Sequence, residues 1–397
     1  MMKHNTSVIY KLFKKNPDKA LHLAQAFLSV EKAREIDYKN PAGTSNELPL
    51  ITFKITPLCN LHCVMCGQRG VKGTLKEDKA VEEVRTIVPM EKYMELTDEV
   101  AHKTQVFYIW GGEPFLYPDF MDLASYMVKR IPIFTVNTNG TLLAKYARRI
   151  VEDQWSGFFI SLDGFKDIND AIRGEGSYQR VIDGIEAINR EKKLQKSVLP
   201  HMGIVTTVSR LNYLYLDKLV EATREIGLSW HIINLGTYTT EKIGEKEEEI
   251  FKKELGVEAY YWRGFATGYN EGIDGNRFSE ILERIHNMDV DHPVITVPVI
   301  RPSKIGTYYS ELETLVRDRC IAPWYSVDIN YNGDVHFCAD YPHYIIGNIK
   351  KESILDIYNN EKAVKFRKVL RNSKNGVFPA CSRCYQLMLC GHRVRGY

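Results

Sequence analysis

Three cysteines stand within eight residues near the start of the chain, in the segment Thr56-Pro-Leu-Cys59-Asn-Leu-His-Cys63-Val-Met-Cys66. Their spacing is C-x3-C-x2-C, and no fourth cysteine lies near them in the sequence. A structural zinc ion takes four protein ligands, whereas three soft thiolates suit an iron–sulfur cluster that leaves one iron open for chemistry. We therefore predict a [4Fe–4S] cluster on Cys59, Cys63 and Cys66. A zinc site that uses His62 or a distant fourth ligand is the alternative.

Five further cysteines occupy the last fifth of the chain: Cys320, Cys338, Cys381, Cys384 and Cys390. Asn332-Gly333 predicts a hairpin turn that would bring Cys320 and Cys338 together. The pair Cys381 and Cys384 has C-x2-C spacing, and two such pairs make a closed four-thiolate site. By itself this pattern indicates zinc and an iron–sulfur cluster equally.

From residue 50 onward, short apolar runs alternate with amphipathic stretches. The strands and helices that these segments predict would position the thiols. The runs are 51–56, 106–110, 133–137, 157–162, 202–208 and 230–235, and helical patterns cover 90–101, 118–129, 142–153, 178–192 and 213–226. Alternation of strands and helices at this spacing predicts a parallel sheet. Six units would form a partial barrel or an open doubly wound sheet, and periodicity alone does not separate these two.

The flanking regions divide the chain further. Residues 1–48 are predicted to be helical, with an apolar stripe over 20–36. Residues 237–310 break the rhythm with a charged helix, a stretch containing Tyr260, Tyr261 and Trp262, and another helix. Those aromatic side chains indicate a core or an interface more than a ligand site. The predicted division is 1–48, a helical extension; 49–236, the core; 237–310, an insertion or linker; and 311–397, a C-terminal domain.

The first cysteine segment, directly after the first predicted strand, resembles the radical S-adenosylmethionine (SAM) superfamily. The resemblance implies that the open iron chelates the amino and carboxylate groups of SAM. Electron transfer would then split the sulfonium and give a 5′-deoxyadenosyl radical. Met65 stands where the family usually has an aromatic residue, and its adaptable apolar side chain can also pack against adenine.

Three more segments match the family at predicted strand ends. Trp110-Gly-Gly-Glu-Pro114 resembles the GGEP loop that holds the methionyl amine, Asn137-Thr-Asn-Gly140 resembles the TNG turn, and Ser161-Leu-Asp-Gly164 with Arg173 resembles the segment near the ribose and carboxylate. The implied cofactor-binding residues are Gly111, Gly112, Glu113, Pro114, Asn137, Asn139, Ser161, Asp163 and Arg173. Ligand sites of parallel α/β folds lie at this carboxyl edge of the strands. The alternative is that the glycines are plain turn residues and that the asparagines bond their own turn.

The C-terminal region resembles the SPASM or twitch extension of radical SAM enzymes, through C-x12-G-x4-C, Gly347-Asn-Ile and C-x2-C-x5-C. That extension holds auxiliary [4Fe–4S] clusters. Val394 occupies the next position where the full pattern has cysteine. We therefore expect one auxiliary cluster, on Cys320, Cys338, Cys381 and Cys384. Cys390 would replace one of those ligands, be a buried bystander, or donate a hydrogen atom near the substrate.

These resemblances imply an α/β fold with a partial (β/α)6 TIM-type barrel, an N-terminal helical extension and a small C-terminal iron–sulfur domain. They imply an enzyme that abstracts hydrogen from a peptide or a carbohydrate-like small molecule. The auxiliary cluster would exchange electrons, which favours a net oxidation, and a flavodoxin or ferredoxin would donate electrons. An epimerase or a protein maturase is the alternative within the family, and a non-catalytic, metal-stabilised binding protein is the alternative outside it.

Composition excludes other classes. A net charge of +3 over 397 residues gives no case for nucleic acid. No run of about 18 apolar residues occurs, so we predict no membrane span. Lys3, Lys11 and Lys14 interrupt any apolar signal-peptide core. We therefore expect a cytoplasmic protein.

Overall fold

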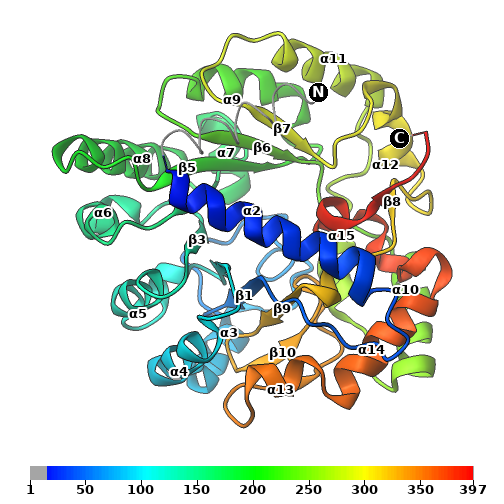
Figure 1. Cartoon of the computed structure of the whole chain (residues 1–397). Coiled ribbons are helices and arrows are strands. Elements are labelled where there is room, and N and C mark those ends of the chain that lie inside the picture. Colours follow the sequence, from blue (N-terminus) through cyan, green and yellow to red (C-terminus); the bar gives the residue numbers. More distant parts are fainter. Residues whose placement is uncertain (1–15, 397) are drawn as a thin grey trace.

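The computed structural model describes residues 16–396, so residues 1–15 of the predicted helical extension lie outside the described part. A ten-stranded sheet forms its centre, in the order β11-β10-β9-β1-β2-β3-β4-β5-β6-β7 (Figure 1). Its strands are β1 Leu50–Lys54, β2 Val106–Trp110, β3 Ile133–Thr138, β4 Gly157–Ser161, β5 His201–Thr207, β6 Trp230–Asn234, β7 Val294–Val297, β9 Ser326–Ile329, β10 Asp334–His336 and β11 Gly347–Asn348. A second, two-stranded sheet pairs β8 Arg317–Asp318 with β12 His392–Arg393.

Strands β1 to β7 run parallel, and β9 is also parallel to β1. The α/β class and the six predicted strands, β1 to β6, are confirmed. The seventh strand, β7, comes from the region that the sequence pattern assigned to an insertion or linker.

The helices between the first strands are α3 Glu77–Glu83, α4 Met90–Val100, α5 Phe120–Val128, α6 Leu143–Glu152, α7 Lys166–Arg173, α8 Ser177–Leu194 and α9 Leu216–Thr223. The later helices are α10 Glu241–Ile250, α11 Gly275–His286, α12 Ile305–Ser310, α13 Ile354–Tyr358, α14 Glu361–Asn372 and α15 Tyr385–Cys390.

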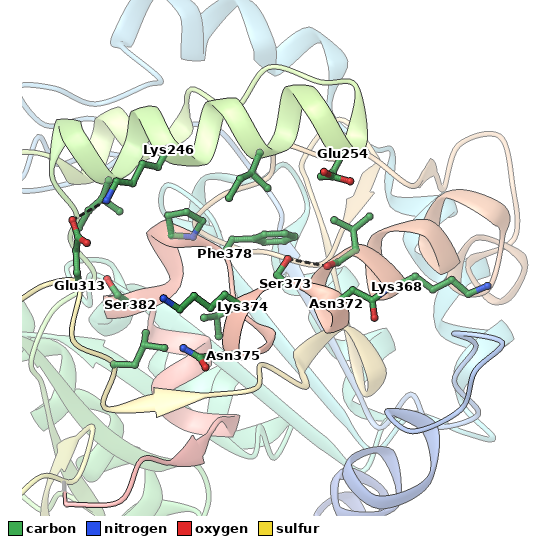
Figure 2. A pocket seen from close by; sticks show the side chains of 16 residues that line it. Lys246, Glu254, Glu313, Lys368, Asn372, Ser373, Lys374, Asn375, Phe378 and Ser382 are labelled. Carbon is green, nitrogen blue, oxygen red and sulfur yellow. Dashed lines mark hydrogen bonds and ion pairs between the residues drawn. The ribbon is translucent and has the colours of Figure 1, made fainter.

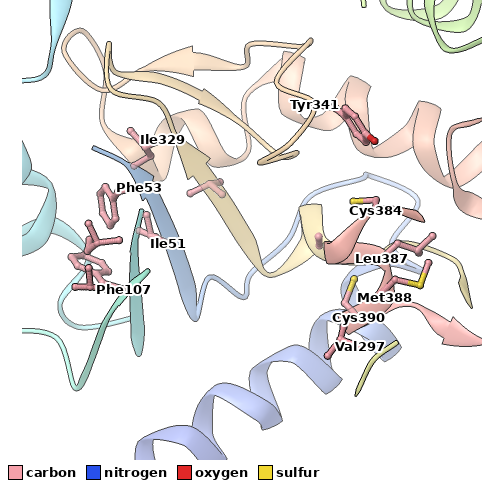
Figure 3. Packing of buried hydrophobic residues seen from close by; sticks show 14 of the residues in the cluster. Ile51, Phe53, Phe107, Val297, Ile329, Tyr341, Cys384, Leu387, Met388 and Cys390 are labelled. Atoms are coloured by element: carbon pink, nitrogen blue, oxygen red, sulfur yellow. The ribbon is translucent and has the colours of Figure 1, made fainter. Parts of the chain in front are cut away.

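Alternate residues of each strand face opposite sides of the sheet. Ile51, Phe53 and Phe107 are fully buried and belong to the core beneath the helices, as Figure 3 shows for adjacent strands. The intervening residues face the barrel interior. There, the rings of Tyr108 and Phe159 lie 5.5 Å apart, and those of Phe159 and Trp230 also lie 5.5 Å apart. These three rings fill part of the interior, so polar inner residues nearer the strand ends have packed aromatic side chains below them.

Helix α2, Pro17–Lys32, lies across the end of the barrel where the strands begin (Figure 1). Lys19 donates to the carbonyl of Pro132, just before β3. His22 Nδ1 lies 2.8 Å from Gln105 Oε1, just before β2. A five-residue π-helical segment, Ala33–Asp37, continues this helix. The N-terminal extension is therefore helical over most of its described part, and it closes the end opposite the first cysteine segment. None of the described helices is both long and apolar enough to cross a membrane.

The predicted hairpin at Asn332-Gly333 is confirmed. Strands β9 and β10 pair antiparallel around it, and Gly333 has a φ of 91°, which a residue with a side chain rarely adopts. Because β9 also pairs with β1, the sheet runs without a break from the N-terminal half of the chain into the C-terminal cysteine region.

Candidate functional site

The first cysteine segment is a loop that leaves β1 at the carboxyl edge of the sheet. Cys59, Cys63 and Cys66 are all unbridged and half-buried. The sulfur of Cys66 accepts hydrogen bonds from the backbone N–H groups of Gln68 and Arg69, each at 3.4 Å. The backbone of the loop thus turns two N–H groups toward this sulfur.

Two predicted strand-end segments reach the other two thiols. Asn139 Nδ2 lies 3.9 Å from Cys59 Sγ, and Arg173 Nη1 lies 3.9 Å from Cys63 Sγ. Burial raises the pKa of Cys59 to about 12 and that of Cys63 to about 11, although the charge of Arg173 opposes the shift at Cys63. Without a metal these two thiols are therefore neutral at pH 7, and binding iron would release their protons.

The GGEP loop after β2 lies directly against the cysteine loop. Gly112 N donates to Thr56 O at 2.8 Å, and Glu113 N donates to Leu58 O at 2.7 Å. A Cβ atom at Gly112 would lie 1.9 Å from Leu58 O, so only glycine fits there. Glycine at this position thus allows close backbone contact within the site, which is more than a plain turn requires.

Glu113 is fully buried, and its carboxyl group binds the turn after β3. It accepts hydrogen bonds from the Thr138 hydroxyl, from Asn139 N at 2.8 Å and from Phe115 N at 3.3 Å. Burial raises the pKa of Glu113 to about 7. Three protein donors therefore occupy most of the roughly four acceptor positions of the carboxylate. Pro114, also buried, begins a 3-10 turn, Pro114–Leu116.

The two predicted asparagines differ in their surroundings. Asn139 donates to Asn60 Oδ1 at 2.8 Å and accepts from Thr141 N at 3.0 Å, so it bonds its own turn and also the cysteine loop. Asn137 is half-buried on the inner face of β3, next to Phe159 in the register. Ser161, at the end of β4, is also half-buried. The structure thus collects these candidates at one edge of the sheet.

Asp163 and Arg173 form an ion pair with a 2.7 Å separation beside the first thiol group. Asp163 is fully buried and also accepts from Thr207 N at 2.8 Å. Burial raises the pKa of Asp163, although the charge of Arg173 opposes that shift. Because Arg173 contacts both Asp163 and Cys63, it places a fixed positive charge between β4 and the thiols.

His62 is turned toward other partners. Its ring is exposed, and Nε2 lies 2.8 Å from Glu77 Oε2 and 3.1 Å from Arg69 Nη2. Within residues 16–396, no three His, Cys, Asp or Glu side chains converge on a position for one metal ion. A cluster takes one thiolate per iron, so its ligands stand at separate corners. The three thiols and their N–H donors fit a cluster better than a zinc ion held by His62.

The second thiol group surrounds α15. Cys384 is the N-cap of α15 and Cys390 is its last residue (Figure 3). Cys381 lies in the preceding 3-10 turn, Pro379–Arg383. Cys320 and these three are buried, and Cys338, after β10, is half-buried. Burial, the charge of Glu247 and the neighbouring thiols hold the pKa of Cys381 well above its usual range. Electrostatic interactions join Cys320 to Cys381, Cys384 and Cys390, and Cys338 to Cys384, so the five thiols share one region. This donor set fits a second iron–sulfur cluster.

Cys390 lies beside Cys320 within this group. The Cys320 thiol donates to Cys390, whose sulfur also accepts from the Tyr325 hydroxyl and from the N–H groups of Ile321 and Ala322. These hydrogen bonds, led by that from Cys320, lower the pKa of Cys390 to about 7. This surrounding resembles that of a cluster ligand or a neighbour of one more than that of a hydrogen donor facing a substrate.

Three charged residues near the barrel interior were missed by the sequence analysis. Lys54 ends β1, with its ammonium 5.9 Å from the ring centre of Trp110, and burial lowers its pKa to about 8. Asp328, on β9, is bound by Thr52 and by Gln386 Nε2 at 3.2 Å, and burial raises its pKa to about 7. Burial also raises the pKa of Asp340, beyond β10, to about 6. A charged residue inside an apolar strand pattern was the available signal for Lys54 and Asp328.

Comparison with known proteins agrees with this geometry, which is that of a parallel α/β barrel with two groups of cysteine thiols. The family model described as the radical SAM superfamily matches residues 53–209. The model described as the SPASM iron–sulfur cluster-binding domain matches residues 320–385. Residues 53–209 therefore belong to the radical SAM superfamily, and residues 320–385 form a SPASM domain.

Curated relatives and solved structures extend the comparison. Mycofactocin maturase MftC of Mycobacterium tuberculosis is 29% identical over 189 residues, which are 47% of this chain and 44% of the maturase, so this chain spans less than half of that relative. Fe-coproporphyrin III synthase of Methanosarcina barkeri is 20% identical over 89% of this chain and 84% of the synthase. The structure of Streptococcus suis SuiB bound to SAM has a TM-score of 0.60 and 15% identity, over 89% of this chain and 74% of SuiB. Native anSMEcpe with bound SAM has a TM-score of 0.54 and 19% identity, over 86% of this chain and 88% of that one. These two likenesses show the fold.

Proposed function

We propose that this chain cleaves SAM reductively and uses the resulting 5′-deoxyadenosyl radical to abstract hydrogen from a substrate carbon. The observation that carries this proposal is the set of contacts around the cysteine loop. The GGEP loop, the turn after β3 and Arg173 of α7 all touch the segment that holds Cys59, Cys63 and Cys66. A [4Fe–4S] cluster bound there supplies the electron that splits the sulfonium.

The surrounding residues would bind and orient SAM. Arg173 offers a cation for the methionyl carboxylate, and Asp163 fixes the position of its guanidinium at 2.7 Å. Gly111, Gly112 and Pro114 let the backbone approach the methionyl end. Asn137 and Ser161 face inward from adjacent strands, on the side assigned to the ribose.

Glu113 would act in two ways. Its carboxyl group holds the turn after β3 through Thr138 and Asn139, and one acceptor position remains for the methionyl ammonium. A bound cation would favour the ionised carboxylate and offset the effect of burial on its pKa.

The substrate class is a peptide or a carbohydrate-like small molecule. Lys54, Asp328 and Asp340 give the region between the two thiol groups both signs of charge, which suits a polar substrate. The SuiB fold has been observed with its precursor peptide SuiA bound, and this supports the peptide as one of the two.

The second thiol group would hold an auxiliary cluster on Cys320, Cys338, Cys381 and Cys384. Its four-thiolate set leaves no open iron, so we assign it electron exchange with the substrate, and hence a net oxidation. A flavodoxin or ferredoxin would supply electrons to the enzyme.

The proposal is tested with anaerobically reconstituted protein, dithionite and SAM, by measuring 5′-deoxyadenosine and methionine. The wild-type chain should release both in equal amounts. The variant with Cys59→Ala, Cys63→Ala and Cys66→Ala should release neither. Formation of 5′-deoxyadenosine by that variant would show that the cleavage site is elsewhere.

A further inference from the structure

Helix α14 presents an unpaired basic face on the surface of the C-terminal region. Residues 361–374 contain six basic residues and one acidic residue, a local charge larger than the +3 of the whole chain. Four lysines of this segment are exposed: Lys362, Lys365, Lys368 and Lys374. None of the four lies within 4.0 Å of a carboxylate in the described part of the chain, whereas Arg148, Arg224 and Lys246 elsewhere on the surface do. We call these four residues the lysine face.

The C-terminal end of the lysine face lies beside the backbone that carries the second thiol group. The turn after α14, Lys374–Gly376, binds the loop before β9, because Cys320 N donates to Gly376 O at 3.0 Å. Beneath α14, Phe366 packs against Phe378, with 5.7 Å between ring centres. Phe378 O accepts from Cys381 N at 3.1 Å. Cys320 and Cys381 are thus each joined by one backbone hydrogen bond to residues 374–378, the segment in which the lysine face ends.

A cavity of about 650 Å³ opens beside this face, between α10 and the segment from α14 to the Cys381 turn (Figure 2). Pro379 and Ser382, which flank Cys381 in the chain, line it. Figure 2 shows Lys374 lying across the cavity on the side of Ser382, with Lys246 on α10 opposite. The acidic groups on the lining are already engaged: Glu313 lies 2.9 Å from Lys246, and Glu254 lies 3.3 Å from Lys253. The opening over the Cys381 turn therefore has a basic rim.

We propose that the lysine face and this cavity form the docking site of a small, acidic, one-electron carrier protein, which exchanges electrons with a cluster on the second thiol group. The inference rests on the proposed function, because it requires a cluster on Cys320, Cys338, Cys381 and Cys384. Each transfer moves one electron between the carrier and the cluster: one of them is oxidised by one electron, the other is reduced by one, and no bond forms or breaks.

Charge complementarity identifies the occupant. Electron-transfer partners meet through small, transient interfaces. Such encounters gain speed from complementary charge, which steers diffusion and is weakened by salt. Four lysines without a carboxylate partner in the described part of the chain match an acidic carrier, and Lys374, at the end of this face, lies next to the segments that carry Cys381 and Cys320.

The test compares two variants with the same change in net charge. The docking variant carries Lys362→Glu, Lys365→Glu, Lys368→Glu and Lys374→Glu. The control variant carries glutamate at four exposed lysines on the barrel helices and their loops: Lys129, Lys193, Lys196 and Lys218. Reduction of the reconstituted holoprotein is followed by stopped-flow absorbance, with reduced flavodoxin and separately with dithionite. Affinity for oxidised flavodoxin is measured by calorimetry.

The docking variant should react with flavodoxin at least about tenfold more slowly than the wild type, and it should bind flavodoxin at least about tenfold more weakly. The rate of its reaction with flavodoxin should lose most of its dependence on salt concentration. The control variant should stay within about twofold on all three measures, and both variants should react normally with dithionite. A second variant, with Lys→Gln at the same four positions, should react with flavodoxin at a rate between those of the docking variant and the wild type.

The inference is overturned if the docking variant keeps the wild-type rate with flavodoxin, or if the control variant is slowed equally. It is also overturned if turnover driven by dithionite falls with the docking variant alone, because the face would then bind substrate. Absence of a second cluster from the wild-type protein would instead contradict the proposed function.

Discussion

In the proposed function, the buried carboxyl group of Glu113 both holds the turn after β3 and binds SAM. Glu113→Gln keeps the side-chain volume but loses a charged hydrogen bond to the methionyl ammonium, at about 1.5–3 kcal/mol. The dissociation constant for SAM should rise about tenfold or more. Equilibrium dialysis with the reconstituted protein measures it.

The matched control is Thr138→Val, which removes one donor to the same carboxyl group and leaves the ammonium position intact. It should lower the melting temperature with less effect on SAM affinity than Glu113→Gln. A Glu113→Gln protein that melts much earlier yet binds SAM normally would contradict the binding role.

Cys390 is expected to affect the reduction potential of the second cluster. If Cys320 binds iron as a thiolate, it has no proton to donate, and the Cys390 thiol becomes the donor between the two sulfurs. Cys390→Ala should keep about eight irons per chain and lower the reduction potential of the second cluster, because hydrogen bonds to the sulfurs tune that potential. Cys390→Ser should restore part of the shift. Redox titration followed by EPR measures the potential, and a loss of about four irons would identify Cys390 as a ligand.

Strand β6 carries a buried histidine, which should make the stability of the protein sensitive to acid. His231 is 1% exposed, with Nε2 2.8 Å from the Thr206 hydroxyl, and burial, with a smaller effect of His292, lowers its pKa to about 3. The unfolded chain binds this proton near pH 6.5. Between these two values the unfolded state holds more protons, so the free energy of unfolding falls as pH falls below about 6.5.

At pH 5 this histidine should account for about 2 kcal/mol of the loss of stability. His231→Gln should therefore show a smaller drop in denaturant midpoint between pH 7.5 and pH 5 than the wild type. His102→Gln, at an exposed position after α4, is the control and should behave as the wild type does. An unchanged drop in His231→Gln would assign the acid sensitivity to other groups.

The elements also show what the sequence could predict. The strands β1 to β6 were predictable because each is an apolar run bounded by an amphipathic helix. The strand β7 was missed because Val294–Val297 is short and follows a region without this rhythm. Motif residues next to β1 to β4 were predictable, since parallel strands end at one edge. The nearness of Lys54, Asp328 and Asp340 was not, because it depends on pairing between β1 and β9, some 270 residues apart.

For the whole molecule, the number of clusters is the decisive quantity. In the proposed assignment, the eight cysteines would serve one three-ligand and one four-ligand site and leave Cys390 over. The reconstituted protein should hold about eight irons and eight sulfides. Replacing Cys381 and Cys384 by Ala should leave about four irons and retain SAM cleavage, because the first site is built from separate residues. Substrate turnover should be lost in this variant. Twelve irons in the wild type would show that residues other than cysteine complete a third cluster.

The pairing of β9 with β1 has a consequence for the solubility of the chain. Strand β1 lies inside the sheet only because the C-terminal region supplies its neighbour. A chain that stopped before β9 would present the backbone N–H and C=O groups of β1 as an open edge, with Ile51 and Phe53 beside it. Such an edge is a template for pairing with other chains. The iron–sulfur region thus also protects the barrel from self-association, and neither part can be exchanged for an unrelated module without a new cover for that edge.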